Sequence, residues 1–342
     1  MKLSTPRWWY VRHGAPAPLT RTLLRPASWL WAGVTARKIA RAKPEAAPVP
    51  VICVGNLTMG GTGKTPVVAE LLRRLNSQGL AAHGLSRGYG GRLTGPLEVD
   101  RAAHTAADVG DEPLMLAQGA RIWISRDRPA GARAAAAAGA RAVVMDDGHQ
   151  NPALRKDLSL VVVDGETRNG DWPFGDGAVF PAGPMREPLK AGLARADAVV
   201  LMLPADLDAP DPELLALLAP TPVLIARLVP AAPPPGGPQV GFAGVGKPWK
   251  VEKALQAAGC QLADFAPLPD HFAYDEATLL RLQRRAEDFG AGLVTTEKDW
   301  VRLPAEWRGR VAAWPVRAAF EDEKALDEIL ARALPQLVRG GH

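Results

Sequence analysis

Short apolar runs and longer helical patterns alternate along most of the chain. The run "VPVICVGN" at 49–56 predicts a strand, and "TPVVAELLRRLNSQG" at 65–79 predicts a helix with one buried face. Further buried strands are predicted at 141–148, 158–165, 196–204 and 221–229. Because apolar strands that alternate with helices are typical of parallel sheets, the pattern predicts an α/β domain with a mostly parallel sheet and helices on both faces.

A proline-rich segment separates this domain from a second one. The stretch "VPAAPPPGGPQ" at 229–239 cannot continue a helix or a strand and indicates a hinge. Beyond it the alternation resumes and ends with a helical pattern at 324–334. We therefore expect three parts, namely an N-terminal arm, a larger domain that ends in the hinge, and a smaller C-terminal α/β domain. Their expected bounds are 1–43, 44–235 and 236–335.

Charge changes the picture of the arm. The whole chain of 342 residues has a net charge of +5, but residues 1–50 hold nine Lys or Arg and one acid, a net charge of +8, so the remainder carries −3. This distribution argues against a basic nucleic-acid-binding body and favours an arm that meets an anionic surface. Cys53 and Cys260 cannot build a disulfide framework, so a reducing compartment, by default the cytosol, is expected.

The same arm is rich in aromatic residues that favour the headgroup level of a bilayer. They are Trp8, Trp9, Tyr10, Trp29 and Trp31. A helix over 29–41 would gather Ala and Ile on one side and basic residues on another, although Leu30 and Val34 fall among the basic ones. We expect the arm to lie on a membrane surface without crossing it, because no apolar run is long enough to span. Packing of this helix on the protein's own core is the alternative.

A glycine-rich loop joins the first strand to the first helix of the larger domain. Its residues are Thr58, Met59, Gly60, Gly61, Thr62, Gly63, Lys64 and Thr65. Backbone N–H groups of such a loop, with the following helix N-terminus, bind phosphate, while Lys64 would bridge the β- and γ-phosphates and Thr65 would hold Mg²⁺. A strict P-loop has glycine at the position of Thr58, and a class of regulatory ATPases has lysine at the position of Met59. The loop therefore predicts nucleoside triphosphate binding but fits neither subclass.

Acidic residues follow two other segments of the larger domain. Asp146 and Asp147 end a buried strand, where one carboxylate can reach the metal or its waters, and the sequence leaves open which one does so. In "DVGDEPLMLA", Asp108 could cap a helix, while Asp111 is a candidate base for an acceptor hydroxyl. In the second domain His271 stands beside an acid, and from spacing alone a single histidine is usually structural.

Taken together, these motifs resemble the tetraacyldisaccharide 4′-kinases of the lipid A pathway. The segments that carry the resemblance are "GNLTMGGTGKTP", "SRGYGG", "DVGDEPLMLA", "VMDDGHQNPALRKDLSLVVVDG", "FPAGPMREPL", "FAGVGKPWK", "DHFAYD" and "LVTTEKDWVRL". The resemblance implies a P-loop NTPase-like domain that transfers the γ-phosphoryl group of ATP, with Mg²⁺, to the 4′-hydroxyl of a tetraacylated glucosamine disaccharide 1-phosphate. It also implies an N-terminal helix that meets anionic lipids at the cytoplasmic face of the inner membrane.

The resemblance also implies roles for individual residues. Asp111 would be the base and His271 its partner, with Lys64 at the transferring phosphoryl group. With Thr65, Asp146 and Asp147 from the loop and the strand end, Glu187 completes the candidate metal ligands, and the candidate substrate contacts are Glu112 and Arg186; Arg186 and Glu187 of "MREP" would hold the metal or a substrate phosphate. The chain departs from the family pattern at His149 and Asn151, which affects loop packing more than chemistry. A membrane-associated regulatory ATPase and a soluble small-molecule kinase are the alternatives.

Overall fold

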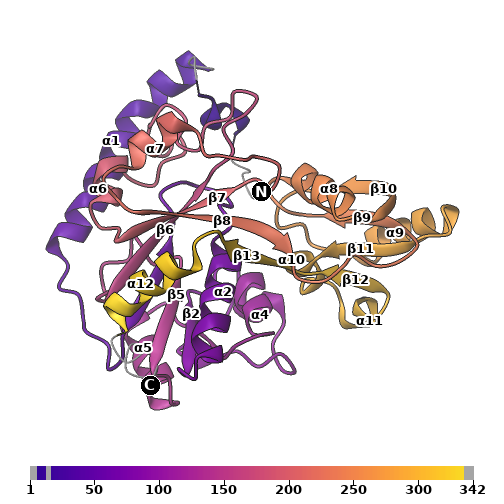
Figure 1. Ribbon diagram of the computed structural model, residues 1–342, viewed down its shortest axis with the longest axis horizontal. Coiled ribbons are helices and arrows are strands. Elements are labelled where there is room, and N and C mark those ends of the chain that lie inside the picture. The colour runs from indigo at the N-terminus through magenta and orange to yellow at the C-terminus, as the bar shows by residue number, and fades with distance from the viewer. Residues whose placement is uncertain (1–5, 13–16, 335–342) are drawn as a thin grey trace.

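The computed structural model describes residues 6–12 and 17–334, and these residues form two sheets. In the described part of the chain the larger sheet has nine strands in the order β13-β8-β7-β6-β1-β5-β2-β4-β3 (Figure 1). They are β1 (Val51–Gly55), β2 (Ala82–Ser86), β3 (Leu97–Glu98), β4 (Ile122–Ile124), β5 (Ala142–Asp146), β6 (Leu158–Asp164), β7 (Ala198–Leu203), β8 (Val223–Pro230) and β13 (Val316–Phe320). Neighbours from β8 to β4 pair in parallel, and the edge strands β13 and β3 pair antiparallel. The predicted mostly parallel sheet is confirmed.

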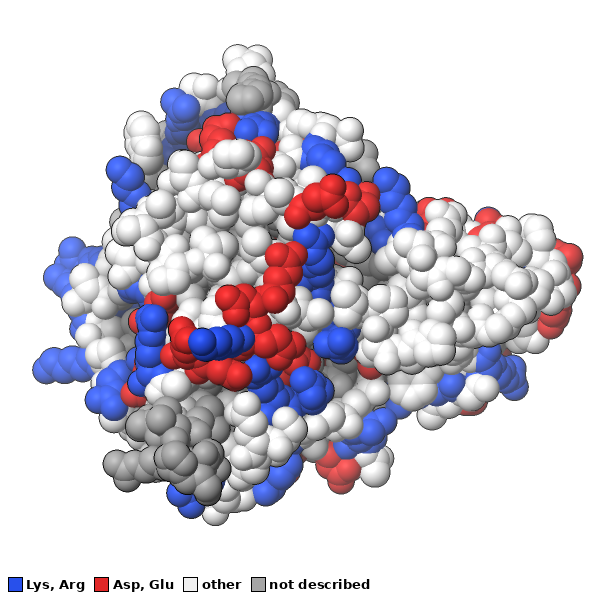
Figure 2. All heavy atoms as spheres, viewed as in Figure 1, with Lys and Arg blue, Asp and Glu red and all other residues white. Residues whose placement is uncertain are grey.

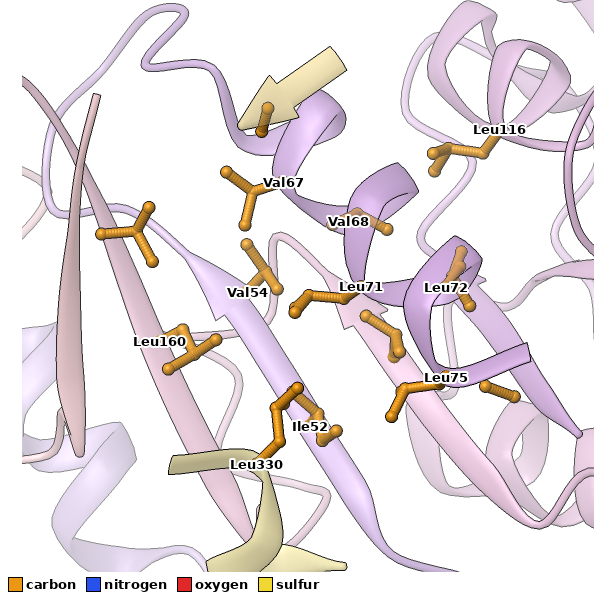
Figure 3. Packing of buried hydrophobic residues seen from close by; sticks show 14 of the residues in the cluster. Ile52, Val54, Val67, Val68, Leu71, Leu72, Leu75, Leu116, Leu160 and Leu330 are labelled. Atoms are coloured by element: carbon orange, nitrogen blue, oxygen red, sulfur yellow. The ribbon is translucent and has the colours of Figure 1, made fainter. Parts of the chain in front are cut away.

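Helices cover both faces of this sheet because side chains alternate along each strand. Ile52 and Val54 of β1 face α2 and pack with Leu71 in one buried cluster (Figure 3). Val51 and Cys53 point to the opposite face and pack with α5. The helices of this domain and the arm are η1 (Arg7–Tyr10), α1 (Pro18–Arg41), α2 (Lys64–Ser77), α3 (Ala106–Val109), α4 (Asp111–Leu116), α5 (Arg128–Ala137), α6 (Leu189–Leu193), α7 (Pro212–Leu218) and α12 (Glu323–Ala333).

The smaller unit is built around a second, fully parallel sheet. Its strand order is β10-β9-β11-β12, and in Figure 1 it forms the orange and gold lobe at the right. The strands are β9 (Pro238–Ala243), β10 (Gln261–Pro267), β11 (Gly292–Thr296) and β12 (Val311–Trp314). The helices are α8 (Pro248–Ala257), α9 (Glu276–Asp288), α10 (Glu297–Trp300) and α11 (Ala305–Arg308). The predicted second α/β unit is present.

The C-terminal segment returns to the first sheet. We expected residues up to 335 to belong to the smaller domain, but β13 pairs with β8 and α12 packs Leu326 and Leu330 into the core cluster of the larger sheet. Burial of these leucines beside Leu160 explains the return, because the face of β6 would otherwise be uncovered. The chain therefore passes between the larger and the smaller domain twice, from β8 to β9 and from β12 to β13. The other domain bounds remain predictions.

Helix α1 is longer than the expected 29–41 and lies along the outside of the larger domain (Figure 1). Its contacts with the body include two polar ones, since Arg21 pairs with Asp176 and the Ser28 hydroxyl accepts the backbone N–H of Ala182 at 3.0 Å, and one ring contact between Trp31 and Phe180. Its exposed large apolar residues are Leu19, Leu23, Trp29, Leu30, Trp31 and Val34. Basic side chains line the same outer edge in Figure 2. The sequence placed Leu30 and Val34 among the basic residues, and both are exposed, so the separation into an apolar and a basic side is incomplete, as expected.

Candidate functional site

The glycine-rich loop lies between β1 and α2, as the sequence predicts. Gly60 and Gly63 have φ values of 94° and 85°, which favour glycine over any residue with a side chain. The amide of Asn56 donates to the backbone carbonyl of Thr58 at 2.9 Å and braces the turn. Helix α2 begins at Lys64 without a side-chain cap, so the N–H groups of its first turn are free to bind an anion. The loop has the local structure of a phosphate site.

Asp147 and Arg186 lie beside this loop. The carboxylate of Asp147 accepts from Arg186 Nη1 at 2.7 Å and lies 3.6 Å from Lys64 Nζ. Burial opposes ionisation of this carboxylate, but the charges of Lys64 and Arg186 lower its pKa to about 2. Arg186 Nε also donates to the carbonyl of Thr58 at 3.0 Å. Asp147 and Arg186 therefore hold Lys64 and the loop in place.

Asp146 is in a different state from its neighbour. It ends β5, opposite Val54 of β1, and is 1% exposed. Among the described groups neither of its carboxylate oxygens has a hydrogen-bond partner, and the hydroxyl of Thr62 is also unpaired. Burial and the charge of Glu112 raise the pKa of Asp146 to about 7, against the opposing charge of Lys64. Unpaired buried oxygens are costly, so this position is built for a group that the protein does not itself supply.

Glu187 has partners inside the protein. Both of its carboxylate oxygens accept from Arg195 Nη2, at 2.7 and 2.6 Å, and one also accepts from Gln150 at 3.0 Å. These contacts argue against the predicted metal role of Glu187, which remains untested. No cluster of three or more His, Cys, Asp or Glu side chains suited to a metal ion occurs in residues 6–12 and 17–334. A bound cation would therefore depend on few protein ligands.

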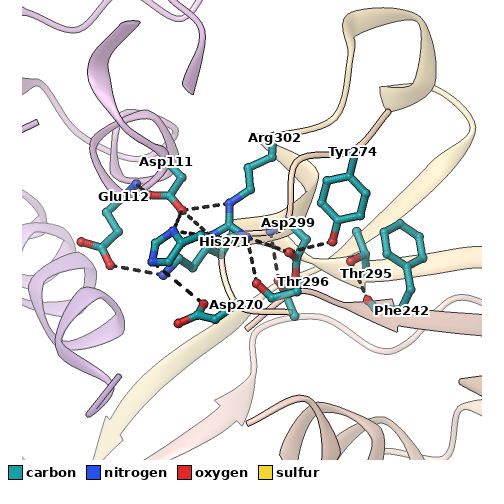
Figure 4. A network of polar contacts seen from close by, with 12 residues as sticks. Asp111, Glu112, Phe242, Asp270, His271, Tyr274, Thr295, Thr296, Asp299 and Arg302 are labelled. Atoms are coloured by element: carbon teal, nitrogen blue, oxygen red, sulfur yellow. Dashed lines mark hydrogen bonds and ion pairs between the residues drawn. The ribbon is translucent and has the colours of Figure 1, made fainter. Parts of the chain in front are cut away.

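The structure brings Asp111 and His271 together across the two lobes. Asp111 begins α4, and His271 lies in the loop after β10 with a φ of 56°, a conformation that non-glycine residues rarely adopt. The two are 160 residues apart in sequence, and His271 Nδ1 lies 3.1 Å from Asp111 Oδ2 (Figure 4). A nitrogen at this distance from a carboxylate donates its hydrogen. The contact with Asp111 favours a hydrogen on Nδ1 of His271.

A third residue, Arg302, completes this cluster and was not among our candidates. Its Nε donates to Asp111 Oδ2 at 2.9 Å, and its Nη2 donates to the same oxygen. Burial of Asp111 opposes its ionisation, but the His271 hydrogen bond and the charges of Lys298 and Arg302 hold its pKa well below the usual range. Lys298 also reaches Glu112 at 3.4 Å. The motif "LVTTEKDWVRL" contained both cations, but no local pattern indicates that they reach α4.

Asp108 has a structural role in this arrangement. Thr105 is the N-cap of α3, and the Asp108 carboxylate accepts from the Thr105 N–H at 2.8 Å and from its hydroxyl at 2.7 Å. Asp108 is thus the N3 residue of a capping box and not the cap itself. His149 is likewise structural, because its ring bonds Ser159 Oγ at 3.0 Å and the Gly192 carbonyl at 2.9 Å. Burial lowers the pKa of His149 to about 4, so its ring is neutral at pH 7.

Comparisons with known proteins show the family of this chain. Residues 20–335 match the model of the family described as tetraacyldisaccharide-1-P 4′-kinase. The chain is 69% identical over 330 residues to a tetraacyldisaccharide 4′-kinase of Caulobacter vibrioides, with 96% of this chain and 98% of that protein covered. It is 52% identical over 315 residues to one from Hyphomonas neptunium, with 92% of each chain covered.

A solved structure gives the same result. The LpxK structure from Aquifex aeolicus in complex with ATP has a TM-score of 0.71 and 26% identity to this chain, and the match covers 92% of this chain and 99% of that one. The fold class and the family that the sequence predicted are confirmed, and the kinase interpretation is supported over the regulatory ATPase. This chain therefore belongs to the tetraacyldisaccharide-1-P 4′-kinase family and is a kinase.

Proposed function

We propose that this kinase transfers the γ-phosphoryl group of ATP to the 4′-hydroxyl of a tetraacylated glucosamine disaccharide 1-phosphate, with Asp111 as the acceptor of the hydroxyl proton. One observation carries the assignment of the base. Asp111 is joined to His271 of the other lobe, with 3.1 Å between Asp111 Oδ2 and His271 Nδ1, and the charge of the adjacent Glu112 helps to raise the pKa of Asp146 at the end of β5. Its ionised state at neutral pH leaves it able to accept a proton.

The donor side of the site binds ATP through the loop from Thr58 to Thr65. Backbone N–H groups at the start of α2 face the phosphates, and Lys64, kept in place by Asp147, bridges the β- and γ-phosphates. Arg186 donates to Asp147 through Nη1 and to the carbonyl of Thr58 through Nε. Its positive charge beside the loop attracts a phosphate group of the donor or of the acceptor. The LpxK relative that was solved with ATP supports this assignment.

The residues present fit a Mg²⁺ ion beside the nucleotide. Asp146 offers two unpaired carboxylate oxygens, and Thr65, the second residue of α2, offers a hydroxyl. These oxygen donors suit Mg²⁺, which keeps several waters and binds through one or two carboxylates and the substrate phosphates. When bound, the ion supplies charge neutralisation at the phosphate oxygens. Glu187 is left out of this set because Arg195 occupies both of its oxygens.

The chemical step needs one proton transfer within the protein. The 4′-oxygen attacks the γ-phosphorus, the bond to the β-phosphate oxygen breaks, ADP leaves, and the hydroxyl proton passes to Asp111. His271 orients the Asp111 carboxylate through Nδ1–H. Because the pKa of Asp111 is low, it is a weak base, and proton transfer follows bond formation at phosphorus in a loose transition state.

The acceptor, with four acyl chains, remains in a bilayer, and we infer that α1 brings the enzyme to it at the cytoplasmic face of the inner membrane. Leu19, Leu23 and Leu30 are 70–80% exposed on α1 among basic side chains, a combination that suits an anionic lipid surface. The helix also contacts the site, because Trp31 Nε1 donates to the carbonyl of Arg186 at 3.2 Å. None of the helices in the described ranges is long and apolar enough to span a membrane.

A kinase assay in mixed micelles tests this function. Purified protein is incubated with Mg²⁺ and γ-labelled ATP, with and without the acylated disaccharide 1-phosphate. We expect labelled lipid to form and ATP consumption to require the acceptor. ATP hydrolysis at the same rate in both samples, without labelled lipid, would refute the proposal and favour the regulatory ATPase.

A further inference from the structure

Arg302 joins the two lobes at the proposed base. It follows α10 in the smaller unit, and its side chain is 8% exposed. Its guanidinium donates to Asp111 on the larger domain and, within its own lobe, to the carbonyl of Gly244 and to Asp299 Oδ1, both at 2.9 Å. Figure 4 shows Arg302 between Asp111 and Asp299. An arginine with partners on all three nitrogens is fixed in position and direction.

Asp299, the partner of Arg302 inside the smaller lobe, is held in turn by two hydroxyl groups. Asp299 is 0% exposed and accepts from the Tyr274 hydroxyl at 2.8 Å and from the Thr296 hydroxyl at 2.7 Å. These two contacts fix both carboxylate oxygens of Asp299. Because a buried, fully satisfied network is rigid, the guanidinium reaches out of the smaller lobe in a single orientation.

The contacts divide the two oxygens of Asp111 between two tasks. Oδ2 accepts Nε and Nη2 of Arg302 and Nδ1–H of His271. Oδ1 accepts the backbone N–H of Glu112 at 3.0 Å and no other donor from the described residues. An oxygen with three donors has little capacity for another proton, so the acceptor hydroxyl must meet Oδ1.

We propose that Arg302 is a positioning residue for phosphoryl transfer, which fixes the Asp111 carboxylate by Oδ2 and turns Oδ1 toward the acceptor hydroxyl. The inference rests on the proposed function of Asp111. A salt bridge that only joined the lobes could use any surface carboxylate. This one engages the carboxylate of the base together with its histidine partner, so it sets the geometry on which transfer depends.

The test uses Arg302→Gln and Arg302→Lys in the full-length protein. We expect Arg302→Gln to lower kcat by about 100-fold, the loss typical of a misplaced catalytic group, while the KM for ATP stays near the wild-type value. Arg302→Lys keeps the charge without the two-nitrogen fork and should recover part of kcat. Arg308→Gln is the matched control, since Arg308 is a partly buried arginine of the same lobe that donates to the backbone carbonyls of Val301 and Leu303, lies over the Trp300 ring and does not contact Asp111.

A double-mutant cycle separates positioning from structure. In an Asp111→Asn background, Arg302→Gln should cause little further loss of kcat, because Arg302 acts through Asp111. A full additional loss, or an equal fall of kcat in Arg308→Gln, would overturn the proposal, as would wild-type kcat in Arg302→Gln. If wild-type protein forms no labelled lipid, the proposed function itself fails, so the two failures are distinguishable. Thermal unfolding of each variant shows whether it folds. If Arg302→Gln does not fold, the kcat of Arg302→Lys decides in its place.

Discussion

The donor and acceptor sides of the site are built in opposite ways. On the donor side the two oxygens of Asp146 and the hydroxyl of Thr62 are buried without hydrogen-bond partners among the described groups. On the acceptor side the Asp111 carboxylate is paired with Arg302 and His271 of the other lobe. On the donor side both oxygens of Asp146 lack partners, whereas on the acceptor side Asp111 Oδ2 holds three donors and Oδ1 has room for the substrate hydroxyl.

This difference indicates what each side requires from outside the protein. An incomplete polar site is stabilised by a ligand that brings its own charges, and nucleotide phosphates with Mg²⁺ do so. A carboxylate that the protein itself orients needs no ligand to take its position, but it requires both lobes to be in place. We therefore expect substitutions on the acceptor side to affect turnover and substitutions on the donor side to affect binding and stability.

Removal of the acceptor pair should have the largest effect. Asp111→Asn and His271→Ala should lower kcat by about 100- to 10,000-fold, because they remove the proton acceptor or its orientation. The affinity for ATP, measured by calorimetry, should be retained since neither residue belongs to the phosphate loop. Near-normal turnover in either variant would remove that residue from the mechanism.

Asp146→Asn should stabilise the protein without ligand at pH 8. Because burial raises the pKa of Asp146 from 3.8 to about 7, the folded state binds more protons than the unfolded state between these values. The free energy of unfolding therefore falls as pH rises from about 4 to about 7, by at most about 4 kcal/mol. Asparagine removes this loss, and chemical unfolding at pH 5 and pH 8 measures it.

Asp147→Asn is the control for that prediction, and its sign is opposite. The pKa of Asp147 is lowered to about 2, so its ionised form stabilises the fold above the ordinary value of 3.8 and this contribution is lost as pH falls through about 2. Asp147→Asn should destabilise the protein at pH 8. Asp146→Asn should also lose much of the thermal stabilisation by Mg²⁺ and ATP. If both variants shift stability in the same direction, the contrast between the two carboxylates is wrong.

Exposed leucines of α1 should contribute to membrane binding by a smaller amount. The triple change of Leu19, Leu23 and Leu30 to Gln should weaken binding to vesicles with anionic lipid by about 1 kcal/mol for each leucine, because apolar burial in the bilayer interface is lost. Sedimentation with vesicles measures the change. Leu280→Gln on α9, where the side chain is 39% exposed, is the control. Equal binding by the triple variant and wild type would refute the membrane role of α1.

The smallest expected effect concerns the contact between α1 and the donor side. Trp31→Phe removes the hydrogen bond to the Arg186 carbonyl but keeps a ring beside Phe180, whose centroid is 5.0 Å away. We expect a loss of about 1 kcal/mol in the free energy of unfolding. Trp29→Phe, at a side chain that is 71% exposed, should change nothing. Indistinguishable melting curves for the two variants would mean that the Trp31 contact has no stabilising effect.

The sequence was most informative where structure is local. The phosphate loop, the central strands and the Asp146–Asp147 pair follow from apolar periodicity and glycine spacing, and β1, α2 and β5 are where the sequence predicts them. His271 became a candidate only through family resemblance, since spacing alone favoured a structural histidine. Local pattern thus identified the donor side more readily than the acceptor side.

Long-range pairing explains what the sequence could not predict. β13 joins the larger sheet through β8, more than 80 residues earlier, because α12 covers a distant core. Arg302 reaches Asp111 over 191 residues, and its motif gives no sign of the partner. The two members of the acid pair look alike in sequence, and only burial and the neighbouring cations separate Asp146 from Asp147. Such differences depend on the folded environment.

The most direct test of the account is a single-turnover transfer experiment with matched acceptors. Enzyme loaded with Mg²⁺ and γ-labelled ATP is mixed with the acylated disaccharide 1-phosphate or with the same lipid carrying a methyl ether at the 4′-oxygen. We predict rapid labelling of the free acceptor by wild type, slow labelling by Asp111→Asn at equal ATP occupancy, and none of the blocked lipid. Label on the blocked lipid, or equal rates in the two proteins, would contradict the account.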